Sequence, residues 1–124
     1  MRKPTTVELT EDCRVLCIED DPAQLETLAE LLRLWGATVD EASDLAGART
    51  LLELRPYDLI LADYNLPDGT AAELLENPEW DRKIVVVSAA APTPQRPRGG
   101  LVVQKPLTRA KLQRILAASA CSAN

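Results

Sequence analysis

Short apolar runs, each closed by a polar residue, constrain the fold of this 124-residue chain more than any other feature. The three clearest are RVLCI at residues 14–18, LILAD at 59–63 and IVVVS at 84–88. Runs that are apolar almost throughout, without alternation, are typical of central parallel strands that are buried on both faces of a sheet. A more exposed strand, suited to an edge of the sheet, is expected at 38–42, and a fifth strand at 101–105.

Segments with apolar residues at helical spacing lie between these runs. They cover about residues 25–35, 45–55, 70–77 and 108–117. Asp44 and Thr108 can cap the second and the last of these helices at their N-termini, and Gly36 stands at a C-cap position. Alternating short strands and helices predict an α/β domain with a parallel sheet and right-handed crossovers.

One segment breaks the alternation. Residues 89–100 contain three closely spaced prolines and a Gly-Gly pair, which do not support a regular helix. We therefore expect the helix between the fourth and fifth strands to be missing or reduced to a Pro-rich loop. The expected domain boundaries are an N-terminal arm at 1–12, one domain at 13–119 and a tail at 120–124.

Composition excludes several classes of protein. The net charge of −5 is unlike that of a nucleic-acid-binding domain, which usually carries a basic face. No segment is long and apolar enough for a membrane span or a signal peptide, so we expect a cytoplasmic protein without membrane or nucleic-acid partners. Because the chain has no histidine, it contains no Ser-His triad and forms no phosphohistidine. Neither Gly-rich pattern of dinucleotide or P-loop binding occurs.

The three cysteines form no even disulfide framework. Cys17 lies in an apolar run, where a thiol is usually a small buried hydrophobe. A metal site built on Cys13 and Cys17 is disfavoured because no histidine can complete it. Cys121, near the end of the chain, is expected at most to link two molecules in oxidising buffer.

Polar residues follow four of the predicted strands at the point where each strand ends. They are Glu19, Asp20, Asp21, Asp63, Ser88 and Lys105. The carboxyl ends of parallel strands share one edge of a sheet, where ligands bind in such folds, so these side chains are expected to meet. Clustered carboxylates favour a cation, and all-oxygen ligation suits Mg²⁺. Together with a lysine and a hydroxyl they predict a site for phosphoryl transfer to an aspartate.

Each of these residues also has an ordinary structural interpretation. Asp20 or Asp21 could simply cap a helix, Ser88 could be a strand-end residue, and Lys105 a solvated charge. Asp63 is harder to explain in this way, because it ends the most apolar strand and burial of a carboxylate is costly. We disfavour the view that all of them meet at one edge by accident.

Four motifs carry a resemblance to a known family. VLCIEDDP, DLILADYNLPDG, IVVVSA and VVQKP occur in order over about residues 14–118. In these motifs the chain resembles the CheY-like receiver domain of two-component response regulators. The resemblance implies a flavodoxin-like, doubly wound sheet of five parallel strands in the order 2-1-3-4-5.

The resemblance also implies roles for individual residues. Asp63 matches the phosphoacceptor, and Glu19 and Asp20 match the acidic pair that holds Mg²⁺ with it. The remaining matches are Asn65 as a metal ligand through its carbonyl, Ser88 as the switch hydroxyl, Lys105 as the lysine that contacts the phosphoryl group, and Pro106 after a cis peptide bond. Asp21 lies one place beyond the acidic pair.

The chain departs from the family pattern at two places. Val102 stands where an aromatic residue is usual, and residues 89–100 replace the usual helix. We therefore expect intact phosphorylation chemistry with an altered readout.

The leading hypothesis is a stand-alone receiver that is phosphorylated by a histidine kinase or histidine phosphotransfer protein and signals through an unknown downstream protein. It would not be an enzyme, beyond its own autophosphorylation and autodephosphorylation. The alternative is a receiver-like interaction module that works without phosphorylation. A phosphatase of the haloacid dehalogenase type is disfavoured, because such enzymes need a second aspartate where this chain has Asn65.

Overall fold

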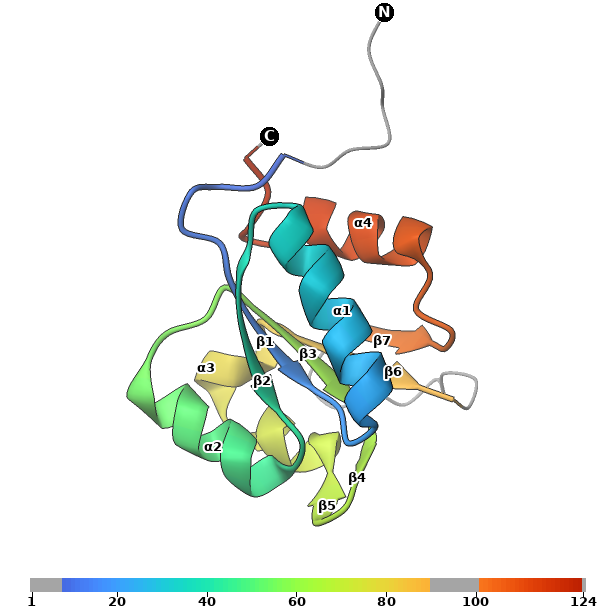
Figure 1. The fold of residues 1–124 in the computed structure, drawn as a ribbon. Coiled ribbons are helices and arrows are strands. Elements are labelled where there is room, and N and C mark those ends of the chain that lie inside the picture. The colour runs from blue at the N-terminus through green and yellow to red at the C-terminus, as the bar shows by residue number, and fades with distance from the viewer. Residues whose placement is uncertain (1–7, 90–100, 124) are drawn as a thin grey trace, which may run out of the picture.

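The computed structural model describes residues 8–89 and 101–123, and a five-stranded parallel sheet forms its centre (Figure 1). The strands are β1 (Arg14–Ile18), β2 (Thr38–Ala42), β3 (Leu59–Asp63), β6 (Ile84–Ser88) and β7 (Leu101–Gln104). Their order is β2-β1-β3-β6-β7, with every pair of neighbours parallel. This confirms the predicted flavodoxin-like fold and places the more exposed 38–42 strand at an edge.

Helices cover both faces of the sheet. They are α1 (Pro22–Leu34), α2 (Leu45–Leu54), the 3₁₀ helix η1 (Ala71–Glu76), the short α3 (Pro78–Asp81) and α4 (Arg109–Ala117). The predicted caps are present: Asp44 accepts a hydrogen bond from Gly47, Thr108 accepts one from Lys111, and Gly36 has a positive φ of 107°.

Successive side chains of each strand point to opposite faces of the sheet, so the core consists of two layers. On one face, Val15 and Cys17 of β1 pack with the buried side chains of α1 and α4. On the other face, Leu16 and Ile18 pack with α2 and η1. Burial on both faces explains why β1 and β3 are apolar in every interior position.

Two local features differ from the sequence-based expectation. The segment predicted as a helix at 70–77 is a 3₁₀ helix, and it follows a hairpin of β4 (Asn65–Leu66) and β5 (Gly69–Thr70). Gly69 has a φ of 150°, a conformation that side-chain-bearing residues rarely adopt. The predicted absence of a helix between the last two strands concerns residues 90–100, which lie outside the described part of the chain.

The prediction for Cys13 and Cys121 was wrong, whereas the prediction that Cys17 is a buried thiol is confirmed. Cys13 and Cys121 form an intramolecular disulfide across 108 residues, while Cys17 is a buried free thiol. The physical reason is that the segment after α4 returns to the start of β1, where Leu9 and Ser122 form an antiparallel bridge. In Figure 1 the two ends of the described chain lie side by side at this end of the sheet.

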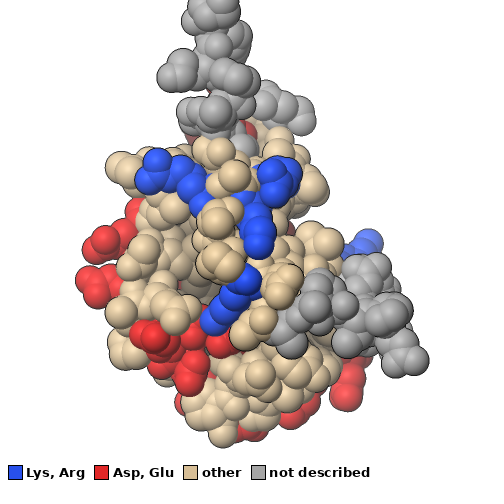
Figure 2. Space-filling model, turned by 90° about the vertical axis from the view of Figure 1, so that its right-hand side faces the viewer, with Lys and Arg blue, Asp and Glu red and all other residues tan. Residues whose placement is uncertain are grey.

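Charge is unevenly distributed over the face that Figure 2 presents. Lys and Arg side chains gather over its upper and central part, and Asp and Glu side chains lie mainly around the left and lower rim. The sequence of α4, RAKLQRILA, contributes three basic residues and no acidic one. Among the described residues, no helix is both long and apolar enough to cross a membrane.

Candidate functional site

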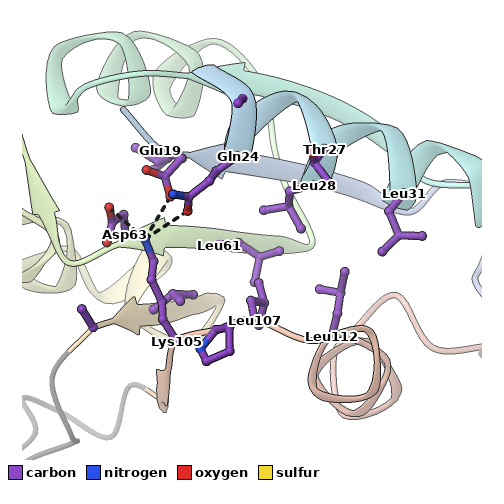
Figure 3. Close-up of a pocket in the computed structure, with 15 residues that line it drawn as sticks. Glu19, Gln24, Thr27, Leu28, Leu31, Leu61, Asp63, Lys105, Leu107 and Leu112 are labelled. Atoms are coloured by element: carbon purple, nitrogen blue, oxygen red, sulfur yellow. Dashed lines mark hydrogen bonds and ion pairs between the residues drawn. The ribbon is translucent and has the colours of Figure 1, made fainter. Parts of the chain in front are cut away.

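Three carboxylates meet at the carboxyl edge of the sheet because β1 and β3 are neighbours in register. Ile18 pairs with Ala62, so the residues that follow, Glu19 and Asp63, leave the sheet side by side. Oxygen atoms of Glu19, Asp20 and Asp63 all lie within 4.8 Å of one another. Glu19 is the one charged residue in the described part of the chain that is classed as buried, with 8% of its surface exposed. Figure 3 shows Glu19 and Asp63 near each other at one end of the pocket, with Lys105 pointing toward them.

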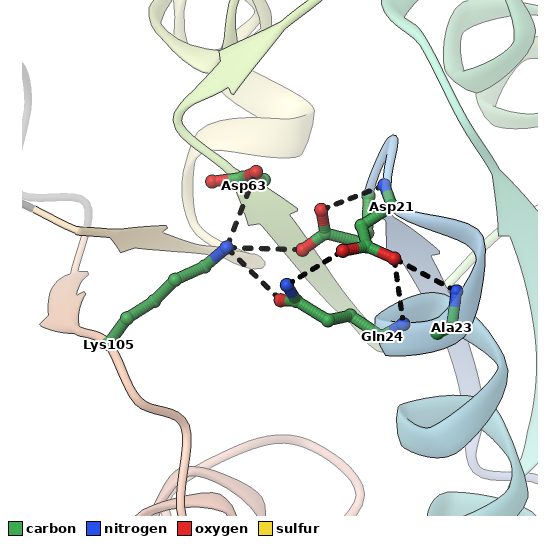
Figure 4. Close-up of polar contacts among 6 residues, drawn as sticks. Asp21, Ala23, Gln24, Asp63 and Lys105 are labelled. Atoms are coloured by element: carbon green, nitrogen blue, oxygen red, sulfur yellow. Dashed lines mark hydrogen bonds and ion pairs between the residues drawn. The ribbon is translucent and has the colours of Figure 1, made fainter.

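Lys105 reaches these carboxylates from the end of β7. Its ammonium nitrogen lies 3.3 Å from Oε1 of Glu19 and 3.5 Å from Oδ2 of Asp63, and it also donates to the Gln24 side chain (Figure 4). The backbone amide of Lys105 donates to the carbonyl of Ser88 at 2.7 Å. The peptide bond to Pro106 is cis, as predicted.

Burial and charge shift the acid–base behaviour of this group. Burial and the neighbouring Asp63 carboxylate raise the pKa of Glu19, against the opposing effects of the hydrogen bond from the Asp21 amide and of Lys105. Burial alone would lower the pKa of Lys105, but Asp63 and Glu19 raise it above its ordinary value of 10.5. The site therefore holds more negative charge than its lysine compensates, which is the condition under which a bound cation is favoured.

Asp21 and Asp20 are neighbours in the sequence but make different contacts. Oδ1 of Asp21 accepts hydrogen bonds from the amides of Ala23 and Gln24, so it is the N-cap of α1. The amide of Asp21 in turn donates to Oε2 of Glu19. Of the two aspartates that could have been caps, Asp21 is the cap and Asp20 belongs to the carboxylate cluster.

Ser88 and Asn65 lie on the segments that border the carboxylates. Asp63 pairs with Val87, so Ser88 is one residue beyond that pair at the end of β6. Asn65 follows two residues after Asp63 and pairs with Thr70 in the β4–β5 hairpin. Their sequence positions agree with the proposed site, and their individual roles remain predictions.

A cleft that the sequence did not predict opens beside the charged group. Its volume is about 700 Å³, and it passes between α1 and the segment that leads into α4. Its apolar walls are Leu28, Leu31, Leu61, Leu107 and Leu112, which point toward one another in Figure 3. In the sequence these leucines carry the same periodic signal as ordinary core residues, so nothing distinguishes a cleft wall from a filled core.

The chain is similar to known receiver domains in sequence. The family model of the response regulator receiver domain matches residues 15–117. A gliding motility regulatory protein of Myxococcus xanthus is 32% identical over 106 residues, which cover 82% of this chain and 14% of that protein.

Two solved structures resemble the whole domain. The first is a CheY-like receiver domain from Methylobacillus flagellatus, 27% identical with a TM-score of 0.74, covering 86% of this chain and 98% of that one. The second is a Burkholderia pseudomallei response regulator with a phosphorylated aspartic acid, calcium ion and citrate. It is 25% identical with a TM-score of 0.72, covering 86% of this chain and 66% of that one.

The sheet order and the charged group at its carboxyl edge define a doubly wound α/β domain with an acidic site. The chain belongs to the response regulator receiver domain family of two-component systems.

Proposed function

We propose that this receiver accepts a phosphoryl group on Asp63 from a histidine kinase or a histidine phosphotransfer protein. The observation that carries the proposal is the convergence of Glu19, Asp20 and Asp63 within 4.8 Å, with the Lys105 ammonium beside two of them. An isolated structural ion pair would need one carboxylate. A cluster of three carboxylates, two of them beside one lysine, suits a site that takes up a cation and an anion together.

The donor set fits Mg²⁺. All three side chains offer carboxylate oxygens, which are hard ligands, and no described cysteine or nitrogen ligand competes at this edge. Glu19, Asp20 and Asp63 would hold the ion, together with the backbone carbonyl of Asn65. When bound, Mg²⁺ would supply Lewis-acid stabilisation of the phosphoryl oxygens.

The chain's own residues account for the rest of the transfer. A carboxylate oxygen of Asp63 attacks the phosphorus of the phosphohistidine, an O–P bond forms, the N–P bond breaks, and the imidazole leaves with the bonding electron pair. Lys105, already 3.5 Å from Asp63, stabilises the negative charge that the phosphoryl group brings. Ser88 donates its hydroxyl to a phosphoryl oxygen. Hydrolysis of the acyl phosphate by water returns the free carboxylate.

The response to phosphorylation would differ from that of a typical family member. Val102 is half-buried and packs against the core layer formed with α2. No aromatic side chain at this position links Ser88 to the surface, so the change at Ser88 would be passed on through other contacts. The output would be binding to an unidentified protein or transfer of the phosphoryl group in a phosphorelay.

The family comparisons support this function. The Burkholderia structure, with its phosphorylated aspartic acid and calcium ion, has the same fold as this chain at 25% identity. We further propose that residues 13–119 are the receiver unit and that the protein acts in the cytoplasm, where histidine kinases present their phosphohistidine.

Intact mass spectrometry after incubation with acetyl phosphate, and separately with a phosphorylated histidine phosphotransfer protein, tests the proposal. A phosphoryl adduct that needs Mg²⁺ and is absent from Asp63→Ala is expected. Asp58→Asn is the matched control, because Asp58 stands at the opposite end of β3, where it accepts a hydrogen bond from the Arg14 amide. An adduct on Asp63→Ala would mean that another residue accepts the phosphoryl group. No adduct on the wild type with either donor would support the phosphorylation-independent module.

A further inference from the structure

The chain closes on itself at the amino end of the sheet. We call residues 8–13 and 118–123 the terminal clasp. Within it the Thr10 amide donates to the Cys121 carbonyl at 2.8 Å, and the Ala123 amide donates to the Glu8 carbonyl at 2.9 Å. The disulfide joins the same two segments, and both cysteines are fully buried. Two hydrogen bonds and one covalent bond therefore hold the end of the chain against the start of β1.

Helix α4 connects this clasp to the charged site. One face of α4 packs through Leu112, Ile115 and Leu116 into the core layer that also contains Cys13 and Cys121. At the other end of α4, the Lys111 ammonium donates to the carbonyls of Gln104 and Pro106, at 2.8 and 3.2 Å. These two carbonyls flank Lys105. The position of Lys105 thus depends on a helix whose far end is held by the disulfide.

The third cysteine does not compete for the bond. Cys17 lies in the same core layer as the disulfide, and burial raises the pKa of its thiol to about 12. A thiol of this kind is almost entirely protonated at neutral pH and is a poor partner for exchange. Cys13 and Cys121 are therefore expected to pair only with each other, because the Cys17 thiol does not take part in exchange.

We propose that the Cys13–Cys121 disulfide is a reversible latch through which the thiol–disulfide state of the cell regulates the phosphoacceptor site; this inference rests on the function proposed above. In a reducing compartment, disulfides are usually transient or redox-sensing rather than permanent. The Cys13–Cys121 disulfide meets that description, because it holds the segment that follows α4, and α4 contacts the carbonyls on both sides of Lys105.

The switching step is thiol–disulfide exchange with a small thiol of the glutathione class. One small thiolate attacks a sulfur of the Cys13–Cys121 bond, forming a mixed disulfide and releasing the other cysteine as a thiolate, which takes up a proton. A second small thiolate attacks the small-molecule sulfur of the mixed disulfide. It releases the second protein thiol and leaves the small thiol as its own disulfide. Because both sulfurs are buried, the terminal clasp opens locally before the first attack.

Reduction is expected to loosen α4 and to lower the fraction of molecules with Lys105 in place. The apparent rate of phosphorylation is proportional to the fraction of molecules that have Lys105 in place. We expect this rate to decrease roughly threefold on reduction. Hydrogen exchange should become faster in residues 101–117 and stay unchanged in α2, which lies on the other face of the sheet.

The experiment equilibrates the full chain in glutathione buffers of graded redox ratio. Thiols are counted by alkylation under denaturing conditions and intact mass, and hydrogen exchange and the rate of adduct formation are measured on the same samples. Oxidised protein should take one label, on Cys17, and reduced protein three. The double variant Cys13→Ala/Cys121→Ala should take one label and should match reduced wild type in hydrogen exchange and in the rate of adduct formation in every buffer. Cys17→Ala should respond to the buffers as the wild type does.

The results test the redox latch and the proposed phosphoacceptor function independently. Three labels in every buffer, or exchange in residues 101–117 that ignores the redox state, would overturn the latch whatever the phosphorylation result. A thiol count and hydrogen exchange that respond as expected, with an unchanged rate of adduct formation, would remove the regulatory claim and leave the phosphoacceptor standing. If no form of the protein accepts phosphate, the proposed function fails, and with it the regulatory claim.

Discussion

The two ends of the sheet are built from different kinds of interaction. At the amino end, the disulfide joins Cys13, the residue before β1, to Cys121. There the Asp58 carboxylate accepts a hydrogen bond from the Arg14 amide, and the Tyr57 hydroxyl donates one to Asp40 at 2.6 Å. At the carboxyl end, Glu19 and Asp63 face each other with one lysine at 3.3 and 3.5 Å.

The amino end of the sheet stabilises the fold, whereas the carboxyl end carries the candidate ligand site. Burial and the Asp63 carboxylate raise the pKa of Glu19, so keeping Glu19 ionised in the folded protein costs free energy. The amino end has a disulfide and hydrogen-bonded carboxylates, and these contacts offset such a cost. A domain built in this way can keep a strained set of charges ready for a ligand at one edge, because its other edge holds the fold together.

The largest expected effect comes from the amino end. Removing the disulfide in Cys13→Ala/Cys121→Ala should lower the free energy of unfolding by about 3–5 kcal/mol, because the bond restricts the unfolded chain over a long loop. Urea denaturation of oxidised wild type and variant measures this. Cys17→Ala is the control for loss of a buried sulfur. If the double variant loses no more stability than the control, the amino end does not hold the fold.

A smaller effect is expected at the carboxyl end. Lys105→Met leaves Glu19 and Asp63 facing each other without a cation, so the unfolding free energy in EDTA should fall by about 1–2 kcal/mol. Added Mg²⁺ should raise the melting temperature of the variant more than that of the wild type, since binding stabilises the folded state. Lys83→Met, an exposed lysine before β6, is the matched control. An equal Mg²⁺ response in all three proteins would contradict the proposed metal site.

The strands of the main sheet and the residues at its carboxyl end could be predicted from the sequence. The apolar runs at 14–18, 59–63 and 84–88 predicted the three central strands, because strands buried on both faces leave an unbroken apolar pattern. The strands predicted at 38–42 and 101–105 are the two edge strands, which are more exposed. The convergence of Glu19, Asp63 and Lys105 followed from the parallel direction of those strands, without any knowledge of distances.

What the sequence could not predict depends on segments that meet only after folding. Nothing near Cys121 indicates that the chain returns to β1, and nothing near Asp68 indicates that its carboxylate reaches the start of α2. Asp20 and Asp21 are adjacent and chemically identical, so only their direction of approach distinguishes a cluster member from a helix cap.

That distinction gives the third prediction. Asp20→Ala should weaken Mg²⁺ binding about tenfold, or 1.4 kcal/mol, with little change in stability, because Asp20 is exposed and belongs to the carboxylate cluster. Asp21→Ala should cost about 1 kcal/mol of stability and leave Mg²⁺ affinity nearly unchanged, because it removes the cap of α1. Calorimetric titration and urea denaturation of both variants provide the test. Interchanged results would mean that the two roles have been assigned the wrong way round.

The smallest effect is expected at the β4–β5 hairpin, which connects the carboxyl edge to α2. Asp68 accepts hydrogen bonds from the amides of Leu45 and Ala46, at 2.8 and 3.0 Å, and these bonds hold its pKa below the ordinary 3.8. In Asp68→Asn, one acceptor oxygen and the charge are lost, so the Leu45 and Ala46 amides should exchange a few-fold faster, as measured by NMR.

The pH dependence of this effect follows from the lowered pKa of Asp68. A carboxyl group whose folded-state pKa lies below its unfolded value stabilises the protein above the unfolded value, and the stabilisation disappears as the pH falls through the folded-state pKa. The stability difference between wild type and Asp68→Asn should therefore be constant near neutral pH and shrink below about pH 4. A difference that is equally large in strong acid would mean that Asp68 acts through hairpin geometry and not through its charge.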